Sequence, residues 1–151
     1  MKKKVSSIFF ALLLCTFLNA ECVENQEFLS TKFFKVSVRC APNNNSQVKL
    51  VFLKKHEPVK VLTTFGNWKK IQDIENDSGW VHISALSNKK FIIINSKESK
   101  IMYSKPNIKS TILATIKPRV KCRLISLQDV WCKVQIQKYQ GWITKSELWG
   151  L

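Results

Sequence analysis

Cysteine, histidine and tryptophan are the residues of this chain whose types could do chemistry or bind a ligand. A cysteine nucleophile needs a thiol of lowered pKa with a histidine beside it. The chain has two histidines, His56 and His82, and their spacing from the cysteines indicates no such dyad. P-loop, G-x-S-x-G and H-E-x-x-H motifs are absent, and Asp73, Glu75 and Asp77 gather in one polar loop. We therefore expect no catalytic residues, no cofactor and no metal site.

The tryptophans are the candidates for a binding surface: Trp68, Trp80, Trp131, Trp142 and Trp149. An indole combines a large apolar area with one hydrogen-bond donor, which suits a protein core as well as a ligand groove. One interpretation places Trp68 and Trp131 in a core or a cleft wall. The other has Trp80 and Trp142 lining a peptide groove. The sequence leaves both interpretations open and does not identify the ligand.

Residues 1–20 have the order of a secretory signal peptide. Three lysines follow Met1, an apolar run spans Ile8 to Leu18, and the small Ala20 precedes the expected cleavage point. A buried N-terminal helix or an uncleaved anchor is the alternative. No apolar run reaches the ~18 residues of a transmembrane helix, so we expect none after cleavage. The formal charge of +15 falls to +12 on cleavage, because the segment holds three lysines and no acid. We expect an exported protein of the periplasm or cell envelope.

Four cysteines remain after this cleavage: Cys22, Cys40, Cys122 and Cys132. In an oxidising compartment disulfides are favoured over metal binding. Cys122 and Cys132 flank a predicted hairpin with its turn near residues 126–129, so we predict a disulfide between them. Closing a loop of about eleven residues would stabilise the fold by roughly 3 kcal/mol. Free thiols are the alternative. Cys22 and Cys40 form the second predicted pair by elimination, and Cys22 is alternatively available to join another chain.

The elements that would position these side chains occur twice. Trp68-Lys69-Lys70-Ile71 returns 63 residues later as Trp131-Cys132-Lys133-Val134, and Gly79-Trp80-Val81 returns 62 residues later as Gly141-Trp142-Ile143. A Ser-x-Leu segment at residues 84–86 also repeats, at residues 146–148, and a proline turn at residues 39–43 has a weaker echo at residues 103–107. These nearly constant offsets predict two units of about 60 residues each.

Period-2 alternation within each unit predicts strands with one buried face. Phe34, Val36, Val38 and Cys40 alternate with polar residues, and the pattern recurs at residues 59–61 and 120–124. Turn residues at 43–46 and 76–79 separate the apolar runs. The apolar segment Phe91–Ile94 is expected to pair within a sheet, with Lys89 and Lys90 as flanking gatekeepers against aggregation. Such short strands favour small barrels.

The order of these motifs resembles the bacterial SH3-like domain, with an Arg-x-x-Pro start, a later Trp strand and Gly-Trp-Val before a short end. The second half, from Cys122 to Leu148-Trp149-Gly150, resembles a tandem SH3-like family of alphaproteobacterial envelopes. Tyr103 stands where the second unit would have the motif's arginine. The resemblance implies an all-β fold of two small, five-stranded SH3-like barrels in tandem after a cleaved signal peptide. With the signal pattern and the repeat, we predict a signal peptide over 1–20, a tail over 21–29, and domains over 30–92 and 93–151.

The resemblance implies a non-catalytic binding module that recognises cell-wall peptide or an envelope protein. Two alternatives stay open: a structural or assembly protein of the envelope, and a charge-driven binder of anionic polymer. The lysines stand in pairs, at 54–55, 69–70 and 89–90, which is more typical of a solvated face than of a binding run. We expect no nucleic-acid partner, because the protein is exported and no RNA-binding signature is present. The sequence does not indicate an oligomeric state.

Overall fold

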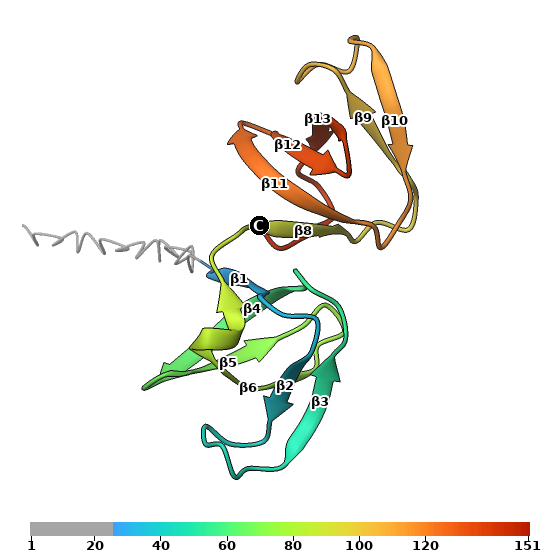
Figure 1. Cartoon of the computed structure of the whole chain (residues 1–151). Helices are drawn as coiled ribbons and strands as arrows, with labels where there is room; N and C mark the ends of the chain where they lie inside the picture. The colour runs from blue at the N-terminus through green and yellow to red at the C-terminus, as the bar shows by residue number, and fades with distance from the viewer. Residues whose placement is uncertain (1–25) are drawn as a thin grey trace, which may run out of the picture.

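The computed structural model describes residues 26–151, so the predicted signal peptide, most of the tail and Cys22 lie outside the described residues. Two all-β units follow one another along the chain and stack with a waist between them (Figure 1). The first contains seven strands and one 3₁₀ turn: β1 (Phe28–Thr31), β2 (Val36–Arg39), β3 (Val48–Phe52), β4 (Pro58–Phe65), β5 (Trp68–Gln72), β6 (Ser78–His82), η1 (Ile83–Ala85) and β7 (Leu86–Ser87).

The second unit repeats this order without the 3₁₀ turn. Its strands are β8 (Phe91–Ile94), β9 (Lys100–Tyr103), β10 (Ile112–Ile116), β11 (Lys121–Gln128), β12 (Trp131–Ile136), β13 (Tyr139–Thr144) and β14 (Leu148–Trp149). Over residues 26–151, no helix is long and apolar enough to cross a bilayer.

The two sheets share one topology. Their strand orders are β3-β2-β6-β5-β4-β1-β7 and β10-β9-β13-β12-β11-β8-β14, the same order shifted by seven strands. All pairings are antiparallel, and matching hairpins carry matching β-bulges, at Val61/Thr63 and at Leu124/Ser126. A bulge bends its strand, and these bends help a short sheet to curl on itself. The prediction of an all-β fold with two tandem barrels is confirmed, although each unit has seven strand segments instead of five.

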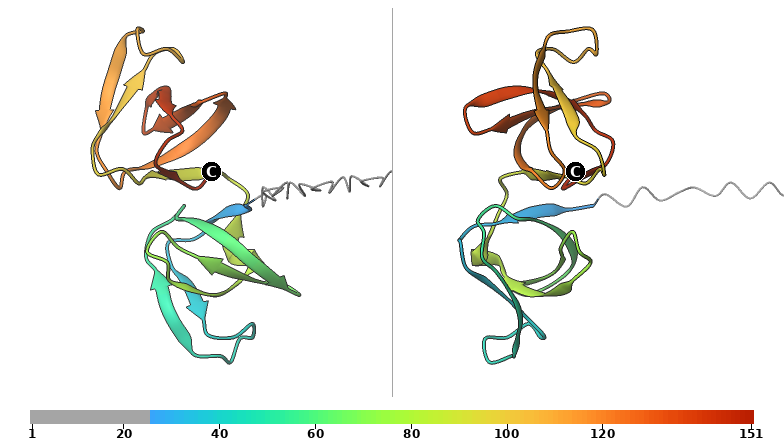
Figure 2. Two further views of the ribbon diagram at one scale, coloured as in Figure 1. Left: turned by 180° about the vertical axis from the view of Figure 1, so that it is seen from behind. Right: turned by 90° about the vertical axis from the view of Figure 1, so that its right-hand side faces the viewer.

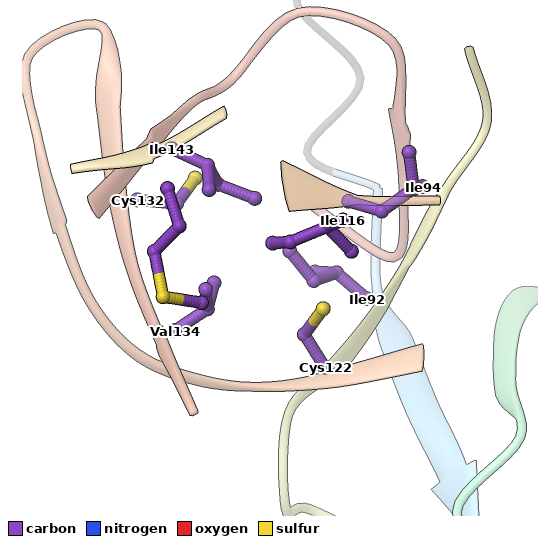
Figure 3. Packing of buried hydrophobic residues seen from close by; sticks show 8 residues of the cluster. Ile92, Ile94, Ile116, Cys122, Cys132, Val134 and Ile143 are labelled. Atoms are coloured by element: carbon purple, nitrogen blue, oxygen red, sulfur yellow. The ribbon is translucent and has the colours of Figure 1, made fainter. Parts of the chain in front are cut away.

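Each unit has its own core, built from the alternating residues of its strands. Val36 and Val38 of β2 point into the first core and are joined there by Leu29, Val59, Ile71, Val81 and Leu86. Figure 3 shows the second core, whose buried members are Ile92, Ile94, Met102, Ile116, Cys122, Cys132, Val134 and Ile143. The buried alternation at β2 is shorter than predicted at both ends. Phe34, before the strand, is 73% exposed, and Cys40, after it, is also exposed.

The predicted limits of the domains differ from the strand boundaries. Phe91–Ile94 pairs with β11 on one side and β14 on the other, as expected of an apolar segment in a sheet, but both neighbours belong to the second unit. Residues 91–92 therefore lie in the second unit rather than the first. At the other end, β1 starts at Phe28, inside the predicted tail, because Phe28 and Leu29 pair with β4.

The first strand of unit one has a polar half that its counterpart in unit two lacks. Ser30 and Thr31 are fully buried. Ser30 Oγ donates to Lys89 O at 2.8 Å, while Thr31 Oγ1 donates to Lys54 O at 3.1 Å and accepts from Glu57 N at 2.9 Å. The corresponding positions of β8 are the buried Ile93 and Ile94. Buried hydroxyls need such partners, so β1 fits its own unit specifically.

The waist is a packed interface between the units. The indole of Trp149 in β14 donates from Nε1 to Pro58 O at 3.0 Å, and its ring meets Phe28 edge-on with centroids 5.1 Å apart. Figure 2 shows β1 and the C-terminal segment meeting at this waist from two further directions. Gly150, with φ of +110°, follows in the left-handed region that favours glycine.

Polar contacts add to this interface on either side of the tryptophan. Lys121 Nζ of the second unit pairs with Glu57 Oε1 at 2.7 Å, and Arg119 Nη2 pairs with Glu75 Oε1 at 2.6 Å. These ion pairs, together with the Trp149 contacts, fix the relative position of the two units.

Candidate functional site

The repeated tryptophans lie on the outer face of each sheet. In β5 and β6, Trp68, Lys70 and Trp80 alternate with the buried Ile71 and Val81. Lys70 is the register partner of Trp80 across the two strands, which places a lysine and an indole side by side. We call the outer side chains Trp68, Lys70 and Trp80 the first aromatic face.

His82 and Arg39 support this first aromatic face. The Trp68 ring meets the His82 ring edge-on, with centroids 5.3 Å apart. His82 Nδ1 accepts from Ser84 N at the start of the 3₁₀ turn, so the imidazole caps that turn. Arg39, the register partner of Trp80, donates from Nη1 to Ser46 O at 2.7 Å and holds the adjoining loop. These contacts give His82 and Arg39 structural tasks at the edge of the face.

The second unit builds the same arrangement from β12 and β13. Trp131 and Lys133 alternate with the buried Cys132 and Val134, and Lys133 is the register partner of Trp142. Lys133 Nζ lies 6.0 Å from the centroid of the Trp142 ring, within the range of a cation–π contact. We call Trp131, Lys133 and Trp142 the second aromatic face. Two strand pairs of equal register thus present the same Trp–Lys–Trp set.

Tyr103 replaces the motif's arginine in this second face. It is the register partner of Trp142, and its ring meets the Trp131 ring edge-on with centroids 5.6 Å apart. Tyr103 therefore contacts one indole of the second face and lies beside the other in the sheet. In the first unit the same position holds Arg39, which contacts a loop carbonyl instead.

The glycine before each tryptophan explains the Gly-Trp spacing. A Cβ atom at Gly79 would lie 2.5 Å from Val38 Cγ1 and 2.8 Å from Arg39 O, both in β2. At Gly141 it would lie 2.7 Å from Met102 Sδ and 2.9 Å from Tyr103 O. Only glycine permits this close approach of the two strands. The approach fixes the strand that carries Trp80 or Trp142 on its outer side.

All four predicted groove residues are half-buried, and none belongs to either buried core. Trp68 and Trp131 are therefore wall residues of the outer faces, placed beside Trp80 and Trp142. Whether these faces bind a peptide stays a prediction.

The predicted Cys122–Cys132 disulfide is wrong: both residues are free thiols. The hairpin turns at residues 129–130, later than predicted, because β11 continues to Gln128. Cys132 therefore faces Leu127, while Cys122 faces Ile92 of β8. Burial raises the pKa of the Cys122 thiol to about 12 and that of Cys132 to about 11, which makes both poor nucleophiles.

The other cysteine pair is not tested by the structure. Cys40 is exposed and has no disulfide partner within residues 26–151, and its predicted partner Cys22 lies outside the described residues. In residues 26–151, no group of three or more His, Cys, Asp or Glu side chains is arranged to hold a metal ion.

Trp149 is the functional tryptophan that the sequence reasoning left without a role. It joins the units through Pro58 and Phe28 instead of lining a face. One signal was available: every other tryptophan has a counterpart 62 or 63 residues away, whereas Trp149 corresponds to Ser87. An aromatic residue that breaks a repeat indicates a contact that only one unit makes.

Comparison with known proteins agrees with the repeated topology. The family model described as bacterial SH3 domain matches residues 35–88 and again residues 96–150. A comparison with curated proteins gave no match. Among solved structures, the chain is similar to NlpC2 from Trichomonas vaginalis, with 15% identity and a TM-score of 0.37, covering 82% of this chain and 48% of that one.

A second solved structure gives the same picture. An NlpC/P60 family protein from Bacillus cereus has 15% identity and a TM-score of 0.36, with 82% of this chain and 57% of that one covered. The chain thus spans about half the length of these solved proteins. The family itself is shown by the two successive matches, which cover more than half of the residues and include β2–β7 of the first sheet and β9–β14 of the second. The chain belongs to the bacterial SH3 domain family and carries two copies of that domain.

Proposed function

We propose that this protein is an exported, non-catalytic binding module of the cell envelope that recognises cell-wall peptide through its two aromatic faces. Bacterial SH3 domains are typical of extracellular and envelope proteins. The observation that carries the proposal is the repetition of the Trp–Lys–Trp set on the outer side of both sheets. An envelope protein that presents an extended segment is the second partner with this chemistry.

The chemistry of each face suits a peptide. Half-exposed indoles provide flat apolar surfaces and N–H donors for peptide groups, while Lys70 or Lys133 can pair with a carboxylate. Two such faces in one chain make binding to a polymer stronger than either face alone, because the second contact becomes intramolecular.

Co-sedimentation with purified cell-wall sacculi tests the proposal. The wild-type protein should sediment with sacculi at low salt and keep most of this binding at high salt. Trp80→Ala and Trp142→Ala should each weaken binding, and the double variant should weaken it further. Phe34→Ala is the matched control, because Phe34 is an aromatic residue that is 73% exposed and lies in the segment before β2, outside both faces.

The outcomes separate the proposal from its alternatives. Binding by the double variant equal to wild type, with unchanged circular dichroism spectra, would contradict the role of the faces. The formal charge of +15 favours one competing function, a charge-driven binder of anionic polymer. That function predicts binding that disappears at high salt and is insensitive to the tryptophans.

A further inference from the structure

A cleft lies where the two units meet, and no residue of either aromatic face lines it. Its larger part is a cavity of about 550 Å³ whose lining includes His56, Phe91, Lys121 and Arg123. A smaller cavity of about 240 Å³ adjoins it and shares His56 and Lys89 with it. We call these two cavities together the junction cleft. Phe91 of β8 lines its larger part, and β8 lies at the waist of the molecule (Figure 1).

The charges lining the junction cleft are all positive. They come from the side chains of Lys32, Lys55, Lys89, Lys121 and Arg123, and no aspartate or glutamate lines either cavity. Within residues 26–151 only Lys121 of these has a carboxylate partner, Glu57. A concave site that gathers unpaired cations raises the local concentration of anions far more than scattered surface lysines do.

The surroundings of His56 show that these positive charges lie close together. Its ring stacks on Phe91 with centroids 4.3 Å apart and an interplanar angle of 9°, and its backbone has φ of 67°. Burial lowers the pKa of His56, and so do the charges of Lys55, Lys121, Lys89 and Arg123, which approach it from both units. His56 Nδ1 is buried and has no hydrogen-bond partner in the described chain.

The remaining walls indicate more than a bare ion. Phe91, Val120 and Ile136 supply apolar surface, and Gln135 and Gln137 supply amide groups. The Gln135 side chain already donates to Gln137 O at 3.0 Å, so this wall is held in place. Apolar surface, amides and a guanidinium together match the side chains, peptide groups and carboxylates of a peptide.

We propose that the junction cleft binds the carboxylates of a short acidic peptide, held by Arg123 and Lys89 at the waist. This inference rests on the proposed function, since it takes wall peptide as the ligand, but it assigns the acidic groups to a site distinct from the aromatic faces. Because His56 and Lys55 come from the first unit and Lys121 and Arg123 come from the second, the site exists only when both units are in their observed positions.

Titration followed by NMR tests the cleft with a defined probe. N-acetyl-diglutamate should shift the amide signals of Phe91, Lys121 and Arg123 along saturable curves, and it should raise the pKa of His56, because a bound anion favours the imidazolium form. The uncharged N-acetyl-diglutamine should do neither. Shifts spread evenly over the lysines of both units, or no saturable shift, would overturn the proposal.

Charge-matched variants make the test specific. Lys89→Gln with Arg123→Gln should weaken binding of N-acetyl-diglutamate by more than tenfold. Lys105→Gln with Lys109→Gln removes the same charge from the exposed loop between β9 and β10, which does not line the cleft. This double variant should change binding by less than twofold. Equal losses in both double variants would overturn the proposal. Circular dichroism spectra of both variants should match wild type, since all four side chains are exposed.

Failure of this inference is distinguishable from failure of the proposed function. If the protein sediments with sacculi through its tryptophans but the diglutamate probe does not bind at the cleft, only the cleft assignment fails. If the probe binds at the cleft but sacculi are not bound, the cleft assignment holds and wall recognition fails.

Discussion

Removing the Trp149 side chain should uncouple the two units. Trp149 donates to Pro58 O at 3.0 Å and meets Phe28 edge-on, and it is the one indole that contacts both units in the described residues. A tryptophan buries ~200 Å². Taking half of this as contact with the first unit gives about 2.5 kcal/mol, at ~25 cal/mol per Å². The hydrogen bond adds about 1 kcal/mol.

Trp149→Ala should therefore lower the free energy of unfolding by about 3.5 kcal/mol. Trp149→Phe keeps a ring against Phe28 and loses only the hydrogen bond, so it should lower that free energy by about 1 kcal/mol. Urea unfolding followed by far-UV circular dichroism measures both values. In the alanine variant we expect the single transition to separate into two, because each unit retains its own core.

The matched control for this series is Phe34→Ala, an exposed aromatic deletion outside the strands that should change the unfolding free energy by less than about 0.5 kcal/mol. A Trp149→Ala variant that unfolds with the midpoint and slope of this control would refute the reasoning. The contacts at the waist would then not contribute to the free energy of unfolding. They would also not hold the two units in the positions that the junction cleft requires.

The other predictions concern the glycines at the close approach of two strands and the buried Cys122 thiol. Gly79→Ala and Gly141→Ala should each destabilise the protein by about 1–3 kcal/mol, because the new methyl group meets backbone oxygens of the neighbouring strand. Thermal unfolding should show a lower midpoint for each variant. An unchanged midpoint would contradict the close approach of the two strands. The pKa of Cys122 is raised to about 12 from 9.0, so the thiol ionises first in the unfolded chain. The free energy of unfolding should thus be retained below pH 9 and fall as the pH rises above it. In urea titrations at pH 7 to 10.5, this free energy should fall less steeply with pH in Cys122→Ala than in wild type. An equal dependence on pH in the two proteins would contradict the prediction.

The repeat made the fold predictable, whereas the register of one hairpin was not. Two copies of the Trp-x-Lys and Gly-Trp segments, with nearly equal offsets, predicted two units of one topology. The disulfide prediction failed because it placed the turn by symmetry between Cys122 and Cys132. The turn instead lies at residues 129–130, so Leu127 is the register partner of Cys132, and the bulge after Leu124 lies beyond this pair.

Contacts between the units were beyond the sequence for a different reason. The junction cleft joins His56 and Lys89 with Lys121 and Arg123, which come together only through the packing of two separately folded cores. Local alternation determines which face of a strand is buried, but it carries no information on how one barrel sits against another.

The polar half of β1 has a consequence for folding fidelity. Tandem copies of one fold risk exchanging equivalent strands, and β1 and β8 occupy equivalent places. If β1 entered the second barrel, Ser30 and Thr31 would meet Trp149 and an apolar core instead of the backbone groups of residues 54, 57 and 89. Two buried hydroxyls without partners would cost on the order of 1–3 kcal/mol each. Ser30 and Thr31 thus disfavour the exchange of β1 and β8 and favour the pairing of each strand within its own barrel.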